Sequence, residues 1–369
     1  MHILAFEEQP TAFAGGQERS LFEVLHGLAE RGCKTSLCYR EEGDLLRAYK
    51  GFLKAWFCIK SRRFTRPFHP LISDIFKLYI RFRVDNWDVL YANQYFDTPV
   101  VASLGILCGI PAVCHLRLAC PEYLSRQYRW GLKQCTKIIA NSNYTKDTYV
   151  NAGLPEELIS VVYNGVDTNW FSPLSIKFSG SLWRRPSRIA YFGRLCPSKG
   201  VEVLLHAFKL IDRKTEPMEL HIIGNVRSPY VGPEYLTQLK EIAASDLETA
   251  VVFKPHIEDI RAELAVTDLV VLPSMCKETF GRTLIEAMSC GVPVIASRVG
   301  GIPEVLAPRF SDHLVPPGNP EALAAMISQL ASWRANRPGL GEACRNWVIT
   351  RFSHADRIDE ILSIFRNLV

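Results

Sequence analysis

The sequence predicts an α/β protein with two Rossmann-like domains, each a doubly wound parallel sheet, joined by a linker. Its 369 residues exceed the ~150 residues typical of one domain. Short apolar runs alternate with longer amphipathic ones, and this alternation starts twice along the chain. Strands that are apolar at nearly every position are buried on both faces, as in parallel sheets covered by helices on both sides.

The first series of apolar runs predicts the strands of a first domain at residues 1–170. Between the first two runs, residues 18–30 repeat leucine and valine with the period of a helix. The uncharged run Thr98–Leu116 approaches the length of a membrane span, but two glycines and Pro111 divide it into helix, turn and strand. The expected strands are 2–6, 34–39, 88–92, 111–116, 137–140 and 160–163.

The second series predicts a second domain at residues 187–352. Between the two series, residues 171–186 lack a clear period and contain proline, serine and glycine, which indicates a linker. The last helical stretch, about 353–369, needs an apolar surface to cover, and we expect it to pack back on the first domain. The expected strands of the second domain are 188–193, 219–224, 250–253, 268–273 and 292–297.

Composition is that of an ordinary globular protein, with 48% apolar and 22% charged residues and a net charge of +5. The eleven cysteines are scattered, without a C-x-x-C pair or zinc spacing, and therefore indicate free thiols in a reducing cytosol. The N-terminal stretch "MHILAFEEQP" lacks the features of a signal peptide. We therefore expect a cytoplasmic protein without a metal site or a cofactor.

Ligands of open α/β sheets bind beyond the carboxyl ends of strands, often on helix N-termini. Gly15 and Gly16 follow the first strand and allow backbone N–H groups to approach an anion, although a simple turn is an equal interpretation. Arg194 and Lys199 follow the first strand of the second domain, where two cations suit a diphosphate, although an ordinary pair of surface cations is an equal interpretation. His115 ends a strand of the first domain.

Two glutamates separated by seven residues, Glu278 and Glu286, follow the strand 268–273. The pattern places Glu278 in a loop and Glu286 about two turns into a helix, with Thr279 as a candidate N-cap and Gly281 admitting close backbone approach. Ionised carboxylates accept hydrogen bonds from hydroxyls, so the pair suits a phosphorylated ligand with many hydroxyls. The apolar neighbours of Glu286 argue against a solvated helix face.

With these motifs in this order, the sequence resembles the retaining nucleotide-sugar glycosyltransferases of the GT-B fold, in particular glycosyltransferase family 4. The family's glutamate pair is matched by Glu278 and Glu286, and its G-R-L-x-x-x-K-G element by residues 193–200. Residues 138–147 and 161–173 match the segments before the interdomain linker. The resemblance spans nearly the whole chain and implies two Rossmann-like domains that face a central cleft.

The resemblance implies a nucleoside-diphosphate sugar as donor, with UDP as the expected nucleotide, and a metal-independent reaction. Arg194 and Lys199 would hold the diphosphate, and Glu286 would accept from the ribose hydroxyls. Glu278 would accept from the donor sugar, with His115 close to the same sugar. The implied catalytic residues are Glu278, His115, Arg194 and Lys199. The implied donor-binding residues are Gly15, Gly16, Arg194, Lys199, Glu278, Phe280, Gly281, Arg282, Thr283, Leu284 and Glu286.

The resemblance also implies a glycan or lipid-linked acceptor, and a role in polysaccharide, lipopolysaccharide or glycolipid biosynthesis. The family often has histidines in the stretch that corresponds to 89–95, where this chain has Tyr91 and Asn93. The residues of the first domain that bind the acceptor therefore stay unassigned. Two alternatives remain: a nucleotide-sugar epimerase of the same fold, and a non-catalytic subunit that binds sugar nucleotides.

The segment 50–83 carries nine lysines and arginines against one acid, Asp74, interleaved with aromatic residues. Cations and aromatic side chains together favour reversible attachment to an anionic membrane surface. The alternative is a solvated face of the first domain. Residues 123–133 have the same character. Single-stranded nucleic acid also binds such mixtures, but the nucleotide-sugar motifs argue against it.

Overall fold

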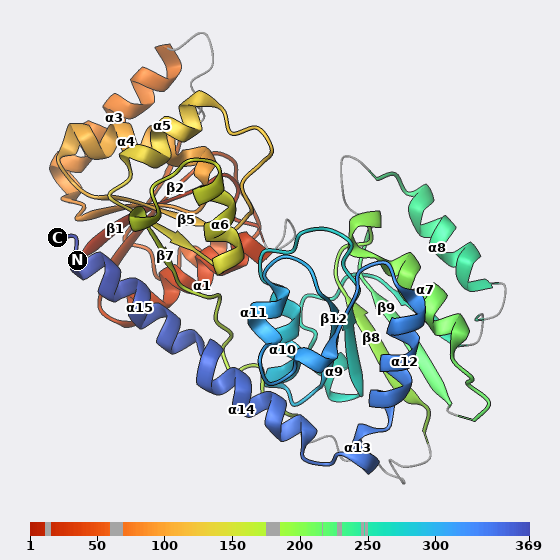
Figure 1. The fold of residues 1–369 in the computed structure, drawn as a ribbon. Helices are drawn as coiled ribbons and strands as arrows, with labels where there is room; N and C mark the ends of the chain where they lie inside the picture. The colour runs from red at the N-terminus through yellow and green to blue at the C-terminus, as the bar shows by residue number, and fades with distance from the viewer. Residues whose placement is uncertain are drawn as a thin grey trace. The chain divides into compact units, whose positions relative to one another are not determined.

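The computed structural model divides the chain into two compact units (Figure 1). Unit 1 contains Met1–Asn164 and Ala355–Val369, and unit 2 contains Gly165–His354. The structure describes residues 1–11, 16–59, 69–174, 185–215, 217–226, 231–244, 247 and 250–369.

The division falls six residues before the expected end of the first domain at residue 170, because hydrogen bonds tie the following segment to unit 2. Val166 forms a parallel bridge with Ser353. The Arg345 guanidinium donates to the carbonyl oxygens of Thr168 at 3.1 Å and Phe171 at 3.2 Å. Of the expected linker 171–186, residues 175–184 lie outside the described part of the chain.

Unit 1 contains a seven-stranded parallel sheet in the order β3-β2-β1-β4-β5-β6-β7. All six strands expected from the sequence are present, within two residues at each end. The edge strand β3 was not predicted, because it is short and its side chains are at least partly exposed. The strands are β1 (His2–Glu7), β2 (Lys34–Tyr39), β3 (Ala55–Cys58), β4 (Val89–Ala92), β5 (Ala112–Leu116), β6 (Lys137–Ala140) and β7 (Ile159–Val161).

Helices cover both faces of this sheet (Figure 1). One face packs against α3 (His69–Asp85), α4 (Thr98–Cys108), α5 (Arg126–Gln134) and α6 (Asn143–Asn151). The other face packs against α1 (Gly16–Glu30), α2 (Leu46–Tyr49) and the last helix, α15 (His354–Arg366). The ring of Phe365 in α15 lies 5.3 Å from that of Tyr91, edge to face. The last helix therefore completes the core of unit 1.

Unit 2 contains a six-stranded parallel sheet in the order β10-β9-β8-β11-β12-β13. The five expected strands are present, and β13, which has two residues, was not predicted. The strands are β8 (Ser187–Phe192), β9 (Met218–Ile223), β10 (Val251–Lys254), β11 (Leu269–Leu272), β12 (Val294–Ser297) and β13 (Leu314–Val315). The helices are α7 (Val201–Leu210), α8 (Glu234–Ala244), α9 (Arg261–Ala265), α10 (Arg282–Ser289), α11 (Ile302–Leu306), α12 (Pro320–Ala331), α13 (Trp333–Asn336) and α14 (Leu340–Phe352).

Both sheets reverse their strand order next to their first strand, between β1 and β4 in unit 1 and between β8 and β11 in unit 2. In doubly wound sheets the loops at the carboxyl ends of these strands diverge and leave room for a ligand. The fold therefore marks one candidate position in each unit.

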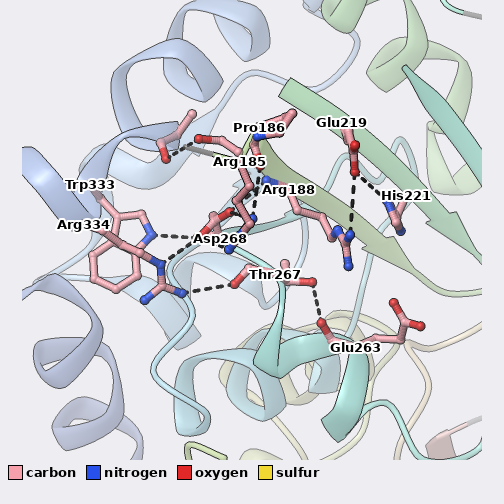
Figure 2. A network of polar contacts seen from close by, with 12 residues as sticks. Arg185, Pro186, Arg188, Glu219, His221, Glu263, Thr267, Asp268, Trp333 and Arg334 are labelled. Atoms are coloured by element: carbon pink, nitrogen blue, oxygen red, sulfur yellow. Dashed lines mark hydrogen bonds and ion pairs between the residues drawn. The ribbon is translucent and has the colours of Figure 1, made fainter. Parts of the chain in front are cut away.

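The amino ends of β8 and β11 carry a polar network centred on Asp268 (Figure 2). Its carboxylate accepts two hydrogen bonds from Arg185, at 2.7 and 3.0 Å, and one from Arg334 at 2.8 Å. The backbone N–H of Arg188 donates to the same carboxylate at 2.8 Å, and the Trp333 indole donates to the Asp268 carbonyl at 2.7 Å. This network joins the start of the sheet to α13.

Within the described ranges, no helix is both long and apolar enough to cross a lipid bilayer.

Candidate functional site

The loop after β8 places Arg194 and Lys199 at the switch point of unit 2. Lys199 lies in a short 3-10 helix, and Gly200 follows it with φ +70°. A Cβ at Gly200 would lie 2.0 Å from the carbonyl oxygen of Pro273, so only glycine allows this loop to approach the loop after β11. The Arg194 side chain is exposed, while its carbonyl oxygen accepts a hydrogen bond from the Tyr191 hydroxyl at 2.6 Å.

The loop after β11 brings Glu278 to Lys199. The two side chains form an ion pair, and both are mostly buried. The Ser274 hydroxyl also donates to Glu278 Oε1 at 2.9 Å. Because the two residues come from neighbouring strands, this pair confirms that the carboxyl ends of β8 and β11 form one polar site.

The loop after β12 fixes the backbone of Glu278. The N–H of Gly301 donates to the Glu278 carbonyl oxygen at 2.8 Å. Gly300 has φ +56°, and a Cβ there would lie 1.9 Å from the same oxygen. Loops from three adjacent strands therefore hold Glu278 in place. Ser274, Gly300 and Gly301 were not singled out from the sequence, although each follows a predicted strand.

Helix α10 begins at Arg282, and Gly281, with φ +85°, is its N-cap. The expectation that Thr279 caps this helix was wrong, because the chain enters the helix through the left-handed conformation that glycine adopts readily. Glu286 is the fifth residue of α10, one turn into the helix and not two. It is buried, and its Oε1 lies 3.5 Å from Arg282 Nη2, which excludes the solvated-face alternative.

The other residues around the start of α10 differ in what they offer a ligand. The side chains of Phe280 and Leu284 are fully buried, and Phe280 packs edge to face on Phe352 at 5.6 Å. These two residues present only backbone groups. Arg282 and Thr283 are partly exposed, as is Gly281. The first N–H groups of a helix lack intrahelical partners and favour anions.

In unit 1, His115 lies in β5 and is buried. Its Nδ1 is 2.6 Å from the Tyr91 hydroxyl and 3.3 Å from Arg117 Nη2. Burial, and then the charge of Arg117, hold the pKa of His115 well below 6.5, so the imidazole is neutral. Gly16 begins α1, and Gly15 lies outside the described residues.

A chain of buried polar groups continues from Arg117 across the switch point of unit 1. Arg117 Nε donates to Asn93 Oδ1 at 2.7 Å, and Asn93 Nδ2 donates to Glu7 Oε2 at 2.6 Å. Burial raises the pKa of Glu7 to about 8, with smaller contributions from nearby acidic groups. Arg117 and Glu7 were missed in the sequence, although each lies at or just beyond the carboxyl end of a predicted strand.

Two family models match the chain. Residues 14–170 match "Glycosyltransferase Family 4", and residues 186–332 match "Glycosyl transferases group 1". The two matches together cover most of both units. The chain therefore belongs to the family 4 glycosyltransferases, which agrees with the resemblance seen in the motifs.

Three curated relatives illustrate the range of similarity. N-acetyl-alpha-D-glucosaminyl L-malate synthase of Bacillus anthracis is 26% identical over 67% of this chain and 63% of that protein. D-inositol 3-phosphate glycosyltransferase of Segniliparus rotundus is 29% identical over 73% of this chain and 61% of that protein. Amylovoran biosynthesis glycosyltransferase AmsK of Erwinia amylovora is 32% identical over 58% and 52%. Each match spans less than two thirds of the relative.

Solved structures show the same fold. Anabaena Alr3699/HepE in complex with UDP superposes with a TM-score of 0.83 at 23% identity and full coverage of both chains. Sucrose-phosphate synthase from Thermosynechococcus elongatus superposes with a TM-score of 0.80 at 20% identity, covering 100% of this chain and 99% of that one. The protein has the GT-B fold, as the sequence predicted.

Proposed function

We propose that the protein is a retaining glycosyltransferase that moves a sugar from a nucleoside-diphosphate sugar, with UDP as the nucleotide, to a glycan or lipid-linked acceptor. The observation that carries the proposal is the pairing of Lys199 with Glu278 at the switch point of unit 2. This position combines a cation for a diphosphate with a carboxylate for sugar hydroxyls. Solved structures of HepE contain UDP and UDP-glucose, and AmsK is named for amylovoran biosynthesis.

The charge of each site residue determines its proposed role. Arg194 and Lys199 stabilise the negative charge that develops on the departing diphosphate, and the N-terminus of α10 adds its partial positive charge. Glu286 accepts from the ribose, and Glu278 accepts from the transferred sugar. The bond from the anomeric carbon to the diphosphate breaks, and the acceptor oxygen bonds on the same face. The acceptor proton passes to the departing diphosphate. The protein's own groups therefore position the two substrates and stabilise the developing charge.

Donor turnover tests the proposal. Nucleotide release is measured from UDP-sugars and GDP-sugars, with and without candidate acceptors, and the anomeric configuration of the glycoside is read by NMR. We expect acceptor-dependent UDP release and retained configuration. Sugar interconversion without a new glycoside would indicate an epimerase, and binding without turnover a non-catalytic subunit. An inverted product would refute retention, and preferential GDP-sugar turnover would refute the choice of UDP.

We propose that Arg194 and Lys199 supply the cationic stabilisation of the diphosphate and that no divalent metal is required. Activity should therefore persist after exhaustive treatment with EDTA. A loss of activity that magnesium or manganese restores would refute this part of the proposal.

We further propose that α3 attaches the enzyme to the cytoplasmic face of an anionic membrane. Four apolar side chains spaced one turn apart form an exposed ridge on this helix, at 52–67% exposure, and the cations Lys77, Arg81 and Arg83 lie along the same helix. Apolar side chains flanked by cations suit the lipid interface. The ridge residues are Ile72, Phe76, Ile80 and Val84. The cations Lys60, Arg62, Arg63 and Arg66 of the same segment lie outside the described residues.

Co-sedimentation with vesicles tests this attachment. Wild type should bind phosphatidylglycerol-rich vesicles, and salt should weaken binding because exposed charges are screened beyond about 8 Å. The double variant Phe76→Ser, Ile80→Ser should lose binding while UDP affinity is kept. The matched control is Leu210→Ser, which changes an equally exposed apolar residue in unit 2. Equal binding by the double variant and the control would refute the ridge as the attachment site.

A further inference from the structure

Two buried side chains converge on one nitrogen of His115. Besides their contacts with Nδ1, the two partners touch each other, since Arg117 Nη2 lies 3.5 Å from the Tyr91 oxygen. Tyr91, His115 and Arg117 are 0%, 2% and 4% exposed, so water does not compete for these contacts. The three residues come from the neighbouring strands β4 and β5 and the residue just beyond β5.

The chemistry of the partners assigns the proton of the ring. A guanidinium only donates hydrogen bonds, so the N–H that Arg117 directs at Nδ1 requires a lone pair there. The Tyr91 oxygen also accepts from Arg117, and its hydroxyl is a second donor group 2.6 Å from Nδ1. With the opposite tautomer, an N–H on Nδ1 would face an N–H of Arg117. A neutral imidazole without a proton on Nδ1 carries it on Nε2.

The ionisation states of Tyr91 and His115 agree with this assignment. Burial raises the pKa of Tyr91 to about 12, so its hydroxyl keeps the proton that it donates. The low pKa of His115 keeps the ring neutral. Only one proton then remains on the imidazole, and the donor-only guanidinium of Arg117 excludes it from Nδ1.

The opposite nitrogen, Nε2, is buried and has no hydrogen-bond partner among the residues that the structure describes. A buried N–H without an acceptor lowers stability, which a functional site tolerates when a ligand supplies the acceptor. We propose that Arg117 and Tyr91 are positioning residues that lock His115 in the Nε2–H tautomer, so that this N–H donates to an oxygen of the transferred sugar. The sugar as partner rests on the proposed function, whereas the tautomer does not.

The polar chain behind Arg117 explains how the guanidinium is held. Besides the bond from Nε to Asn93, its Nη1 donates to Asn164 Oδ1 at 3.1 Å. Asn93 is itself fixed by Glu7, so groups at or beyond the carboxyl ends of β1, β4 and β7 set the angle of the guanidinium. Tyr91 and Asn93 stand where the resembling family often has histidines. In this chain the two positions instead orient His115.

Imidazole NMR on the full chain labelled with ¹⁵N-histidine reads the tautomer directly. His115 should show a protonated Nε2 and an unprotonated Nδ1, with its signals assigned by their loss in His115→Gln. His313 is an internal reference, because its Nδ1 lies 2.8 Å from the carbonyl oxygen of Val294 and must carry the proton. The two buried histidines should therefore show opposite tautomers in one spectrum. An Nδ1–H or charged His115 would overturn the proposal.

Three variants separate a positioning role of Arg117 and Tyr91 from a merely structural one. Arg117→Met should produce a mixture of tautomers and lower kcat/KM for transfer at least about tenfold, while the affinity for UDP, which lacks the transferred sugar, is kept. Arg117→Lys keeps a donor and should recover part of this loss. Tyr91→Phe should shift the tautomer in the same direction, and it decides the question if Arg117→Met fails to fold.

An unchanged tautomer with full turnover in either Arg117→Met or Tyr91→Phe would overturn the proposal. A wild type with the expected tautomer but without any sugar transfer would refute the proposed function, and with it the sugar as partner of His115. That result would leave the Nε2–H tautomer of His115 standing. Failure of the proposed function and failure of the tautomer assignment are therefore distinguishable.

Discussion

Replacing Asp268 by asparagine should lower the stability of unit 2 and leave the turnover of the folded enzyme unchanged. The Asp268 side chain is 6% exposed and accepts four hydrogen bonds, three from arginine side chains and one from a backbone N–H (Figure 2). Asparagine keeps the shape but replaces one oxygen by an N–H donor. Two of the four donors then face another donor, and the arginines lose their counter-charge.

Two lost charge-assisted hydrogen bonds at about 1.5–3 kcal/mol each give an upper range of about 3–6 kcal/mol. The side chains of Arg185 and Arg334 are 26% and 41% exposed and regain water in the variant. We therefore expect a loss of about 2–4 kcal/mol, which overlaps the lower part of the range of about 3–5 kcal/mol for removing one partner of a fully buried pair. For a unit of this size, that loss corresponds to a fall of about 4–16 °C in the unfolding midpoint.

Calorimetry and urea unfolding measure this loss, and Asp259→Asn is the matched control. Asp259 also binds an arginine through both carboxylate oxygens, but its side chain is half exposed, and such pairs contribute little to stability. The control should leave the midpoint nearly unchanged. Turnover of folded Asp268→Asn at low temperature should equal wild type, because the network lies at the amino ends of the strands. Equal midpoints in both variants would refute the reasoning.

Three further predictions concern the polar clusters at the switch points. Glu278→Ala should reduce turnover far more than UDP affinity, and Glu286→Ala should weaken UDP binding; equal losses of UDP affinity would show that the roles are wrong. Lys199→Ala and Arg194→Ala should each lower transfer by about 10²-fold in steady-state assays, whereas near-wild-type rates would remove them from catalysis. Folded Glu7, with a pKa of about 8 against 4.5 unfolded, keeps its proton where the unfolded chain loses it. Urea unfolding at several pH values should therefore show stability falling between those two pKa values, by up to about 1.4 kcal/mol per pH unit, and Glu7→Gln should abolish that contribution; a parallel slope in Glu7→Gln would contradict this.

The apolar runs predicted the fold because parallel strands buried on both faces carry their signal in a few consecutive residues. That signal fails at sheet edges. Residues 55–58 alternate between half-buried and exposed, and β13 has only two residues. The domain boundary could not be predicted from the sequence either. Residues 165–171 belong to unit 2 because this segment forms hydrogen bonds to α14, which lies far along the chain.

The candidate site could be predicted where its residues follow the carboxyl end of a predicted strand and where a single residue type indicates the chemistry. Lys199 and Glu278 follow predicted strands, but their pairing across 79 positions depends on the order of β8 and β11 in the sheet. Arg117 was missed because an arginine after a strand ordinarily lies in solvent. Its burial depends on acceptors supplied by Asn93 and Asn164, from separate parts of unit 1.

The two switch points differ in the kind of group they offer, although the sheets share one strand order. Unit 2 offers full charges, with Lys199 paired to Glu278 and the Arg194 side chain exposed. Unit 1 offers an imidazole held neutral by its surroundings, with its remaining N–H unsatisfied among the described residues. A diphosphate needs the first kind of group, since fixed cations balance its charge. A neutral donor suits a sugar oxygen, because it binds that oxygen without attracting a competing anion. We infer that the switch point of unit 2 suits the charged part of a nucleotide-sugar and that the neutral N–H of His115 suits an uncharged sugar oxygen.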